Sequence, residues 1–496
     1  MGRPGTRTRR RPGLVLTVLA LCGTVVAMQQ TAMVPLLGDL PRLLHTTPDD
    51  ASWMVTAALL AGAVATPIVS RLADVHGKRL LMTTSLAIMV AGSVIGAFAD
   101  TLVLGIVARA LQGAGLAVIP VGIAAMRDEL PPERVPLGVA LMSATLAVGA
   151  GAGLPLSGFV VSHLDWHAVF WVTGGAGALM LVAVPAVLNP PASVTRSAFD
   201  LPGALLLSAG LTALLLALTK GGAWGWTSPA TVGCAVGGVL ALLAFVPLEL
   251  RSRSPLVNLR VARRRPVLLV NLASVLLGFA MYANMLVTTQ LLQLPPATGF
   301  GLGLGTAEAG LWLAPSSLMF GIMAPVAAGL IRRIGAEATL LAGAAVMAGA
   351  YVARIAFSHA LWQIVGGSVL VAAGTSLTFA AMPTLIIRAV PVTETSSANG
   401  LNTLLRSVGT FSSSAATTAL TATGLHLVGA AWLPSFSGLS TVFAIAAGSA
   451  AVAGAIAVVL RATRQPEPGG TVPDLVLRPV PAGGGASAAA RGPRRR

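Results

Sequence analysis

The sequence predicts an all-α integral membrane protein, and three features support this: its composition, its many long apolar runs and the placement of its basic residues. Of its 496 residues, 55% are hydrophobic and 10% are charged, whereas soluble domains carry about 25% charged residues. The formal net charge of +16 does not indicate nucleic-acid binding. The basic residues are scattered through the segments between apolar runs and do not gather in one domain.

A span of about 20 apolar residues crosses about 30 Å of hydrocarbon, and the chain contains fourteen such runs. The first follows three arginines and resembles a signal peptide, but it is too long for an h-region, so we expect an uncleaved transmembrane helix. The predicted spans are 14–38, 52–70, 80–98, 101–125, 136–160, 168–188, 200–219, 229–249, 266–292, 306–331, 337–357, 361–387, 401–424 and 436–460.

Charge placement predicts the orientation. An even number of spans puts both termini on one side of the membrane. With the N-terminus in the cytoplasm, the outer segments contain only Arg42, Lys220 and Arg354, and Arg109 and Arg406 lie within spans. All other basic residues are then cytoplasmic, as the positive-inside rule requires. We therefore expect a multi-pass protein of the plasma (cytoplasmic) membrane with both termini in the cytoplasm.

The segment 70–79 between the second and third spans predicts a tight turn at the membrane surface. Gly77 permits the turn, and Lys78 and Arg79 hold the loop on the cytoplasmic side. Asp74 lies near a helix end, where a carboxylate caps backbone N–H groups or pairs with a cation. We expect Arg127 to be that cation, so that the pair helps to close the cytoplasmic face.

An internal repeat predicts the domain organisation. Pro67, Leu72 and Gly77 have counterparts 258 residues later, where the second copy ends at Gly335. This offset leaves two spans between two sets of six. The predicted units are a basic cytoplasmic tail at 1–13, a six-helix bundle at 14–188, a linker with two extra transmembrane helices at 189–262, a second six-helix bundle at 263–460 and a disordered cytoplasmic tail at 461–496.

The fourth and fifth spans contain the residues that we expect to take part in the mechanism. Arg109 lies about 12 Å inside the fourth span at 1.5 Å per residue. An arginine there is costly unless it is paired or hydrated, so it either lines a cavity or extends to the outer interface. In the fifth span, Gly149 and Gly153 allow close helix packing. Pro155, followed by Gly158, removes a backbone hydrogen bond and bends the helix.

Uncharged polar side chains within the spans are either substrate-lining groups or interhelical hydrogen-bond partners, and the latter is the ordinary role. For Arg406 in the thirteenth span, anchoring at the interface is the alternative. The candidate cavity residues are Gln29, Gln30, Gln112, Asn284, Asn402 and Arg406.

No Asp or Glu falls in the middle of a predicted span. Asp39 and Glu308, at the outer ends of the first and tenth spans, are the nearest titratable carboxylates. Either could pair with Arg109 and carry a proton, although exposure at the interface is the simpler role for both. The absence of a mid-membrane acid weakens the case for cationic substrates.

Four motifs together resemble the 14-helix drug:proton antiporter branch of the major facilitator superfamily, and specifically its actinobacterial multidrug efflux transporters. The loop resembles Gly-x-Leu-Ala-Asp-x-x-Gly-Arg-Lys, with Ser70 in place of the first glycine. Arg109 begins Arg-x-x-Gln-Gly-x-Gly, and Asn402 stands just before Arg406 in a segment typical of these antiporters. The fifth span matches the antiporter motif imperfectly. The resemblance implies two rocking six-helix bundles, drug export by alternating access and a role for Arg109 in proton coupling.

Other functions stay open. An importer or symporter, or a narrow-substrate metabolite exporter, would share the fold. A non-transporting membrane sensor or scaffold is a different class, against which the intramembrane Arg109 argues. The spans contain no nucleophile–base pair, metal-ligand set or phosphate loop, so we expect no enzyme, metal or cofactor. Cys22 and Cys234, the two cysteines, indicate no disulfide framework. The expected partners are a drug-like small molecule, protons and the bilayer, with a monomeric chain and no nucleic acid.

Overall fold

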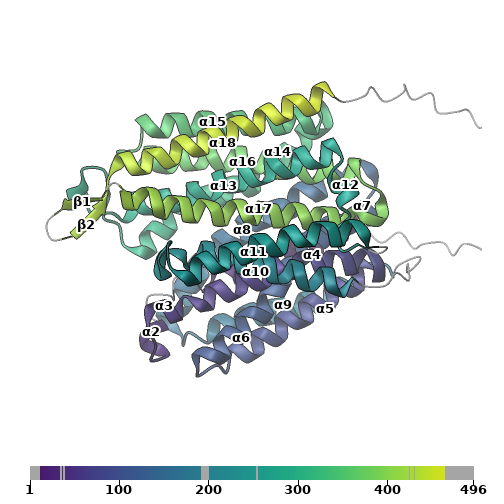
Figure 1. Cartoon of the computed structure of the whole chain (residues 1–496), viewed down its shortest axis with the longest axis horizontal. Helices are drawn as coiled ribbons and strands as arrows, with labels where there is room; N and C mark the ends of the chain where they lie inside the picture. Colours follow the sequence, from purple (N-terminus) through teal and green to yellow (C-terminus); the bar gives the residue numbers. More distant parts are fainter. Residues whose placement is uncertain are drawn as a thin grey trace, which may run out of the picture.

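Long helices run along one common direction and form two packed halves, in a computed structural model of the chain (Figure 1). The structure describes residues 12–33, 36, 40–190, 200–252, 255–423, 425–428 and 431–463. Backbone groups inside a bilayer have no water to bind, so a helix satisfies its N–H and C=O groups internally. This constraint explains why apolar runs of this length fold as helices.

The first half contains α1, α4, α5, α8, α9 and a long helix made of α6 and α7. A 3₁₀ turn, Ala114–Ala117, joins α6 to α7 without breaking the direction of the chain. Two short helices, α2 (Leu40–Leu43) and α3 (Pro48–Ala51), precede α4. The long helices are α1 (Pro12–Thr31), α4 (Trp53–His76), α5 (Lys78–Gly96), α6 (Leu102–Gly113), α7 (Val118–Glu129), α8 (Val135–His163) and α9 (Ala168–Val187).

The second half follows two intervening helices. These are α10 (Leu201–Trp224) and α11 (Pro229–Arg251), and the short α12 (Leu259–Ala262) leads into the second half. Its long helices are α13 (Arg265–Gln293), α14 (Thr306–Ile334), α15 (Ala336–Ala356), α16 (Leu361–Ala389), α17 (Thr395–Thr423) and α18 (Phe436–Ala462). An antiparallel hairpin of β1 (Leu425–Val428) and β2 (Ala431–Pro434) connects α17 to α18. Single 3₁₀ turns lie at Pro132–Arg134, Pro296–Thr298 and Val392–Glu394.

The expected helical membrane fold is confirmed. With α6 and α7 counted as one, the described residues form fourteen helices long enough to be predicted spans. Twelve of these are also apolar enough to cross a membrane. The two helices not among the twelve are α8 and α17, and thirteen residues of α17 are Ser or Thr. The helix α17 also begins six residues before the predicted span.

The two halves show the repeat in three dimensions. Gly77 ends α4 with φ 101°, and Gly335 ends α14 with φ 88°. Both dihedrals favour glycine, and α5 and α15 begin at the next residue in each case. The predicted loop is therefore a single-residue break, because α4 continues to His76. Hereafter the end of the bundle that contains Gly77 and Gly335 is called the Gly77 end, and the opposite end is called the hairpin end.

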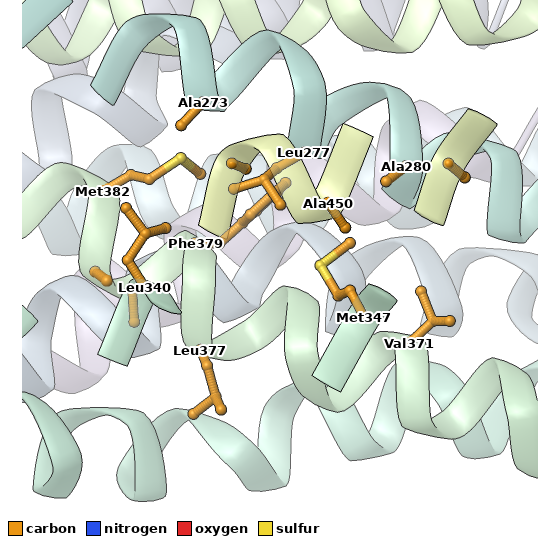
Figure 2. Close-up of a cluster of buried hydrophobic side chains, with 14 of the residues drawn as sticks. Ala273, Leu277, Ala280, Leu340, Met347, Val371, Leu377, Phe379, Met382 and Ala450 are labelled. Carbon is orange, nitrogen blue, oxygen red and sulfur yellow. The ribbon is translucent and has the colours of Figure 1, made fainter. Parts of the chain in front are cut away.

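The second half is held together by a core of apolar side chains that five of its long helices share, α13 to α16 and α18. Figure 2 shows Leu277 and Ala280 of α13 facing Phe379 of α16, with Met347 and Ala450 beside them. All five are buried. A separate core of Val, Leu, Ile and Met side chains fills the first half. Most of each core comes from one half, but α8 adds Ala140 and Ala144 to the core of the second half, and α16 adds Ile387 to that of the first.

The intervening helices α10 and α11 lie against both halves and form no third unit of their own. Leu207 and Leu211 of α10 and Phe245 of α11 share a buried apolar cluster with Leu60 of α4 and Leu404 of α17. Figure 1 shows α10 and α11 in front of the seam where α4 and α17 meet. The pair therefore covers one side of the contact between the halves.

Two cations that the charge count placed in outer segments are buried in helices instead. Lys220 lies in α10 and Arg354 lies in the last turn of α15, with 2% and 1% of their surfaces exposed. The prediction was wrong because hydropathy defines the ends of spans only to within a few residues. A long basic side chain in the last turn of a helix can bend inward as well as outward.

The glycines of α8 lie against α1. A Cβ added at Gly149 would lie 2.9 Å from the Met28 nitrogen, and one at Gly153 would lie 2.6 Å from the Met28 carbonyl oxygen. The two backbones are therefore in direct contact, as small residues allow in membranes. Pro155 and Gly158 belong to α8, but their side chains lie outside the described residues, so the expected bend stays a prediction.

This packing predicts that Gly153→Ala lowers the unfolding temperature of the detergent-solubilised protein. The new methyl group would clash with α1, and overpacking costs about 1–3 kcal/mol. Gly349→Ala is the matched control, since nothing lies within 4 Å of a Cβ at that helical glycine. Fluorescence-detected thermal unfolding measures both variants. Equal unfolding temperatures for the two variants would contradict the packing.

Candidate functional site

Arg109 lies deep in the first half, on the eighth residue of α6. It is 1% exposed, about 10 Å along the helix from Leu102. Its Nε donates to the Met54 carbonyl oxygen at 2.9 Å, and its Nη1 donates to the Gln112 Oε1 at 2.7 Å. This is the geometry of an arginine bound inside the bundle and not of one that extends to the interface.

Further hydrogen bonds connect Arg109 to α1 and α5. Its Nη1 donates to the Gln29 carbonyl oxygen at 3.2 Å and its Nη2 to that of Gln30 at 3.5 Å. The Gln112 Nε2 donates to the Ser93 Oγ at 2.8 Å. We call this set the Arg109 cluster: Arg109, Gln112, Ser93 and the main chain of Gln29, Gln30 and Met54. It joins α1, α4, α5 and α6 around one positive charge.

Of the two acids that could pair with Arg109, only Glu308 lies within the described residues, and it is not a partner of Arg109. Glu308 is exposed in the first turn of α14, and Asp39 lies outside the described residues. The partners are carbonyl and amide oxygens, which supply partial negative charge without titrating. Glu308 has the exposed position at a helix end that the sequence analysis gave as its simpler role, and its pairing with Arg109 stays a prediction.

The second half contains an arginine cluster that the sequence analysis missed. Arg354 of α15 donates from its Nη1 to the Asn284 Oδ1 and from its Nη2 to the Thr288 Oγ1, the latter at 2.8 Å. The Asn284 Nδ2 donates to the Ser368 Oγ at 3.0 Å. The Phe443 ring lies 4.4 Å from the guanidinium. The spacing of Asn284 and Thr288 by four residues on one helix face was the available signal.

Four of the candidate cavity residues serve as interhelical hydrogen-bond partners. These are Gln29, Gln112 and Asn284, and also Asn402, whose Nδ2 donates to the Asn271 Oδ1 at 3.1 Å. The Gln29 Nε2 donates to the Gln112 carbonyl oxygen at 3.2 Å. Within the described residues, the Gln30 side-chain amide is buried and makes no hydrogen bond.

Arg406 stands in the middle third of α17 and is 7% exposed. Its guanidinium lies 4.8 Å from the centroid of the Phe379 ring of α16. No hydrogen bond or ion pair to its side chain occurs within the described part of the chain. Interfacial anchoring does not fit a buried residue at this depth.

At the Gly77 end, Asp74 binds the first turn of α17 across the two halves. Its Oδ1 accepts from the Ser396 nitrogen at 3.0 Å, and its Oδ2 accepts from the nitrogen and the Oγ of Ser397 at 2.7 and 2.6 Å. The carboxylate thus caps a helix N-terminus, where the backbone dipole favours a negative charge. The partner is backbone N–H and hydroxyl groups, not Arg127, so the expected ion pair is corrected.

Arg127 makes a neighbouring contact between the same halves. Its Nη1 donates to the Thr395 Oγ1 at 2.6 Å and to the Val390 carbonyl oxygen at 3.4 Å. Lys78 pairs with Asp128 inside the first half and also donates to the Ala124 carbonyl oxygen at 3.2 Å. We call Asp74, Arg127 and the segment 395–397 the Gly77-end latch. Arg79 stands beside it as the second residue of α5.

These groups can hold and release, but they cannot carry out a reaction among themselves. The latch consists of polar contacts between the two halves, and such contacts can break without unfolding either half. In the Arg109 cluster, the permanently charged guanidinium is bound by neutral oxygens. Its hydrogen bonds to these oxygens can be exchanged for others. The arrangement suits a protein that alternates between two packings of the same helices.

Comparison with known proteins identifies relatives over most of the chain. A model of the Major Facilitator Superfamily matches residues 19–414. The multidrug resistance protein Stp of Mycobacterium tuberculosis is 28% identical over 376 residues, which is 75% of this chain and 69% of Stp. The cephamycin export protein CmcT of Amycolatopsis lactamdurans is 30% identical over 418 residues, covering 82% of this chain and 85% of CmcT.

A tetracenomycin C resistance and export protein of Streptomyces glaucescens is 28% identical over 342 residues, covering 68% of this chain and 62% of that relative. The fold also matches two solved structures. These are the human organic anion transporter MFSD10, with TM-score 0.64 at 14% identity over 90% of this chain and 99% of that one, and the proton:xylose symporter XylE, with TM-score 0.62 at 12% identity over 90% and 94%.

The Arg109 cluster predicts that Arg109→Lys lowers the unfolding temperature in detergent. A lysine keeps the charge but lacks the planar fork that binds several oxygens at once. Removing one partner of a buried charged network typically costs about 3–5 kcal/mol. Arg461→Lys is the control, because Arg461 is exposed at the end of α18. An Arg109→Lys protein as stable as the control would show that the cluster does not hold these helices together.

Proposed function

The chain belongs to the Major Facilitator Superfamily, and we propose that it exports small lipophilic or amphipathic drugs or antibiotics by proton antiport through alternating access. The observation that carries the proposal is the likeness to relatives named for drug resistance and antibiotic export, over two thirds of the chain or more. The two clusters and the latch supply the moving parts that such export requires.

The proposed cycle begins with the latch closed. Asp74 then caps α17 and Arg127 binds Thr395, which seals the Gly77 end of the contact between the halves. Breaking these contacts lets the halves rock about their shared middle and opens that end. The positive-inside pattern makes the Gly77 end cytoplasmic and puts both termini in the cytoplasm of a plasma-membrane protein. Alternate opening of the two ends moves a solute outward.

Proton coupling is assigned to Arg109 acting with an acid that can titrate. An arginine keeps its proton at any physiological pH, so it cannot itself be the carrier. Its role is to exchange its hydrogen bonds to the Gln29 and Gln30 carbonyl oxygens for water or a carboxylate as the proton enters. Asp39 and Glu308 stay the proposed acceptors. The protein acts as a monomer without cofactor or metal, and it catalyses transport and no chemical reaction.

An importer or symporter is the second candidate function, since the xylose symporter shares the fold. The glycine-lined contact of α8 with α1 and the names of the relatives favour export. A metabolite exporter with a narrow substrate range would use the same machinery. A non-transporting sensor would have no use for a latch between the two halves.

Drug accumulation in cells that lack their own efflux pumps tests the proposal. Cells that express the native chain should accumulate less of at least one compound in a broad panel than cells with an empty vector. A protonophore should abolish the difference, because it removes the gradient that drives antiport. Cells that express Arg109→Ala at the same abundance in the membrane should accumulate as much of the compound as cells with the empty vector.

Accumulation above the vector control would identify an importer. Unchanged accumulation for every compound would leave a narrow metabolite exporter or a sensor. Export that persists at full rate in Arg109→Ala would remove that residue from the coupling.

The latch predicts that Asp74→Asn slows export about tenfold or more while the protein still folds. An asparagine has one amide oxygen and presents N–H groups to donors, so hydrogen bonds to a charged acceptor are lost. Glu133→Gln is the control, because Glu133 is exposed on the 3₁₀ turn after α7. Initial rates of dye efflux, normalised to surface abundance, measure the effect. A native rate in Asp74→Asn would show that the latch does not gate transport.

A further inference from the structure

The buried charges of this bundle are almost all positive. Four cationic side chains are less than 9% exposed: Arg109, Lys220, Arg354 and Arg406. Among the described carboxylates, only Glu249 is equally buried, and it lies in the last turn of α11. The other described carboxylates lie in loops or within a turn of a helix end. The middle of the bundle therefore has an excess of positive charge.

Three of these cations have polar partners in the protein. Arg109 and Arg354 bind the oxygens described above. Lys220 donates to the Ser52 Oγ at 2.7 Å and lies 5.0 Å from the Trp53 ring. Arg406 differs, because its guanidinium has no polar partner within the described residues and lies over the face of the Phe379 ring. A buried guanidinium that has five N–H donors and no acceptor is costly in a low-dielectric interior.

The surroundings of Arg406 reach the contact between the halves. The Phe379 ring packs edge-on against the Phe320 ring of α14, with centroids 5.8 Å apart. The next residue, Gly321, faces Val148 of α8, whose Cγ2 would lie 2.7 Å from a Cβ added at Gly321. Arg406, the Phe379 ring and the Phe320 ring therefore follow one another toward the contact between α14 of the second half and α8 of the first.

The same face of α17 carries two more polar groups that lack partners. Ser413 and Thr417 follow Arg406 by seven and eleven residues, which places all three on one side of the helix. The Ser413 Oγ and the Thr417 Oγ1 are buried and make no hydrogen bond within the described residues. Arg406 and these hydroxyls thus form a row of donors beside an aromatic platform.

We propose that Arg406 binds the negative group of the substrate, so that the chain exports amphipathic anions: small molecules with a carboxylate or phenolate on an aromatic or apolar body. Guanidinium groups prefer such oxygens and bind them in pairs. The Phe379 ring, which is fully buried, supports one face of the guanidinium and leaves its N–H groups for the oxygens of the substrate. The inference rests on the proposed export function and specifies its substrate class.

Export of an anion also fits a membrane interior that is short of carboxylates. The potential across a cell membrane is negative inside and favours outward movement of negative charge. The charge of the substrate therefore contributes to the driving force. A cationic substrate would meet repulsion from the unpaired guanidinium instead.

The inference is tested by comparing the efflux of anionic and cationic compounds from cells that lack their own pumps. The anions are benzylpenicillin and carboxyfluorescein, the latter delivered as its diacetate ester and released in the cytosol. The cations are ethidium and rhodamine 6G. We expect the native chain to expel anions and to leave the cations unaffected. Arg406→Gln should slow anion efflux about tenfold or more, as the loss of a charge-assisted hydrogen bond predicts.

Two further variants separate binding from folding. Arg406→Lys keeps the positive charge but lacks the planar guanidinium that binds two oxygens at once. It should therefore restore part of the rate of anion efflux. Arg461→Gln removes an exposed charge at the end of α18 and should match the native chain. As a second readout, benzylpenicillin should raise the unfolding temperature of the purified native chain and not that of Arg406→Gln.

Each outcome decides between the two claims. Efflux confined to cations, or anion efflux at the native rate in Arg406→Gln, would overturn the substrate class and leave the export function standing. Efflux of no compound, here and in the broad panel, would overturn the export function and this inference with it.

Discussion

The scarcity of buried negative charge governs the arrangement of this helix bundle. Each cation inside must find its stabilisation in carbonyl oxygens, amide oxygens, hydroxyls or aromatic faces. Arg109 and Arg354 do this by drawing helices together, so each half is organised around a guanidinium as well as around an apolar core. Because these acceptors are neutral, their hydrogen bonds can be exchanged at a lower cost than those of a buried ion pair.

The two arginine clusters are related but not symmetric. Gly367, on α16, stands 258 residues after Arg109, and the Arg354 side chain from the neighbouring helix α15 passes directly beside it. Both clusters also bind the first helix of their half, through Gln29 and Gln30 in α1 and through Asn284 and Thr288 in α13. The same place in each repeat is therefore filled by an arginine that comes from a different helix. Arg406 has no such set of acceptors among the described residues, which is why we propose that a solute binds beside it.

The general fold and the position of Arg109 could be predicted from sequence because they depend on local patterns. Apolar length, the glycine at 77 and the spacing to Gly335 define the helices and the repeat. The partners could not be predicted, since they depend on which helices meet. Asp74 faces backbone N–H groups because α17 begins six residues earlier than hydropathy indicates, and its Ser and Thr residues concealed that start. Arg354 was missed because the charge count assigned it to an outer segment although the predicted span 337–357 includes it, whereas in the fold it turns inward to Asn284.

Proton movement in everted membrane vesicles tests the central claim of antiport most directly. Respiration acidifies these vesicles and quenches a pH-sensitive acridine dye. If the chain exchanges protons for an exported compound, adding that compound should restore the fluorescence only when the native chain is present, as protons leave the vesicles. Accumulation of the compound inside the vesicles with the dye still quenched would contradict proton antiport.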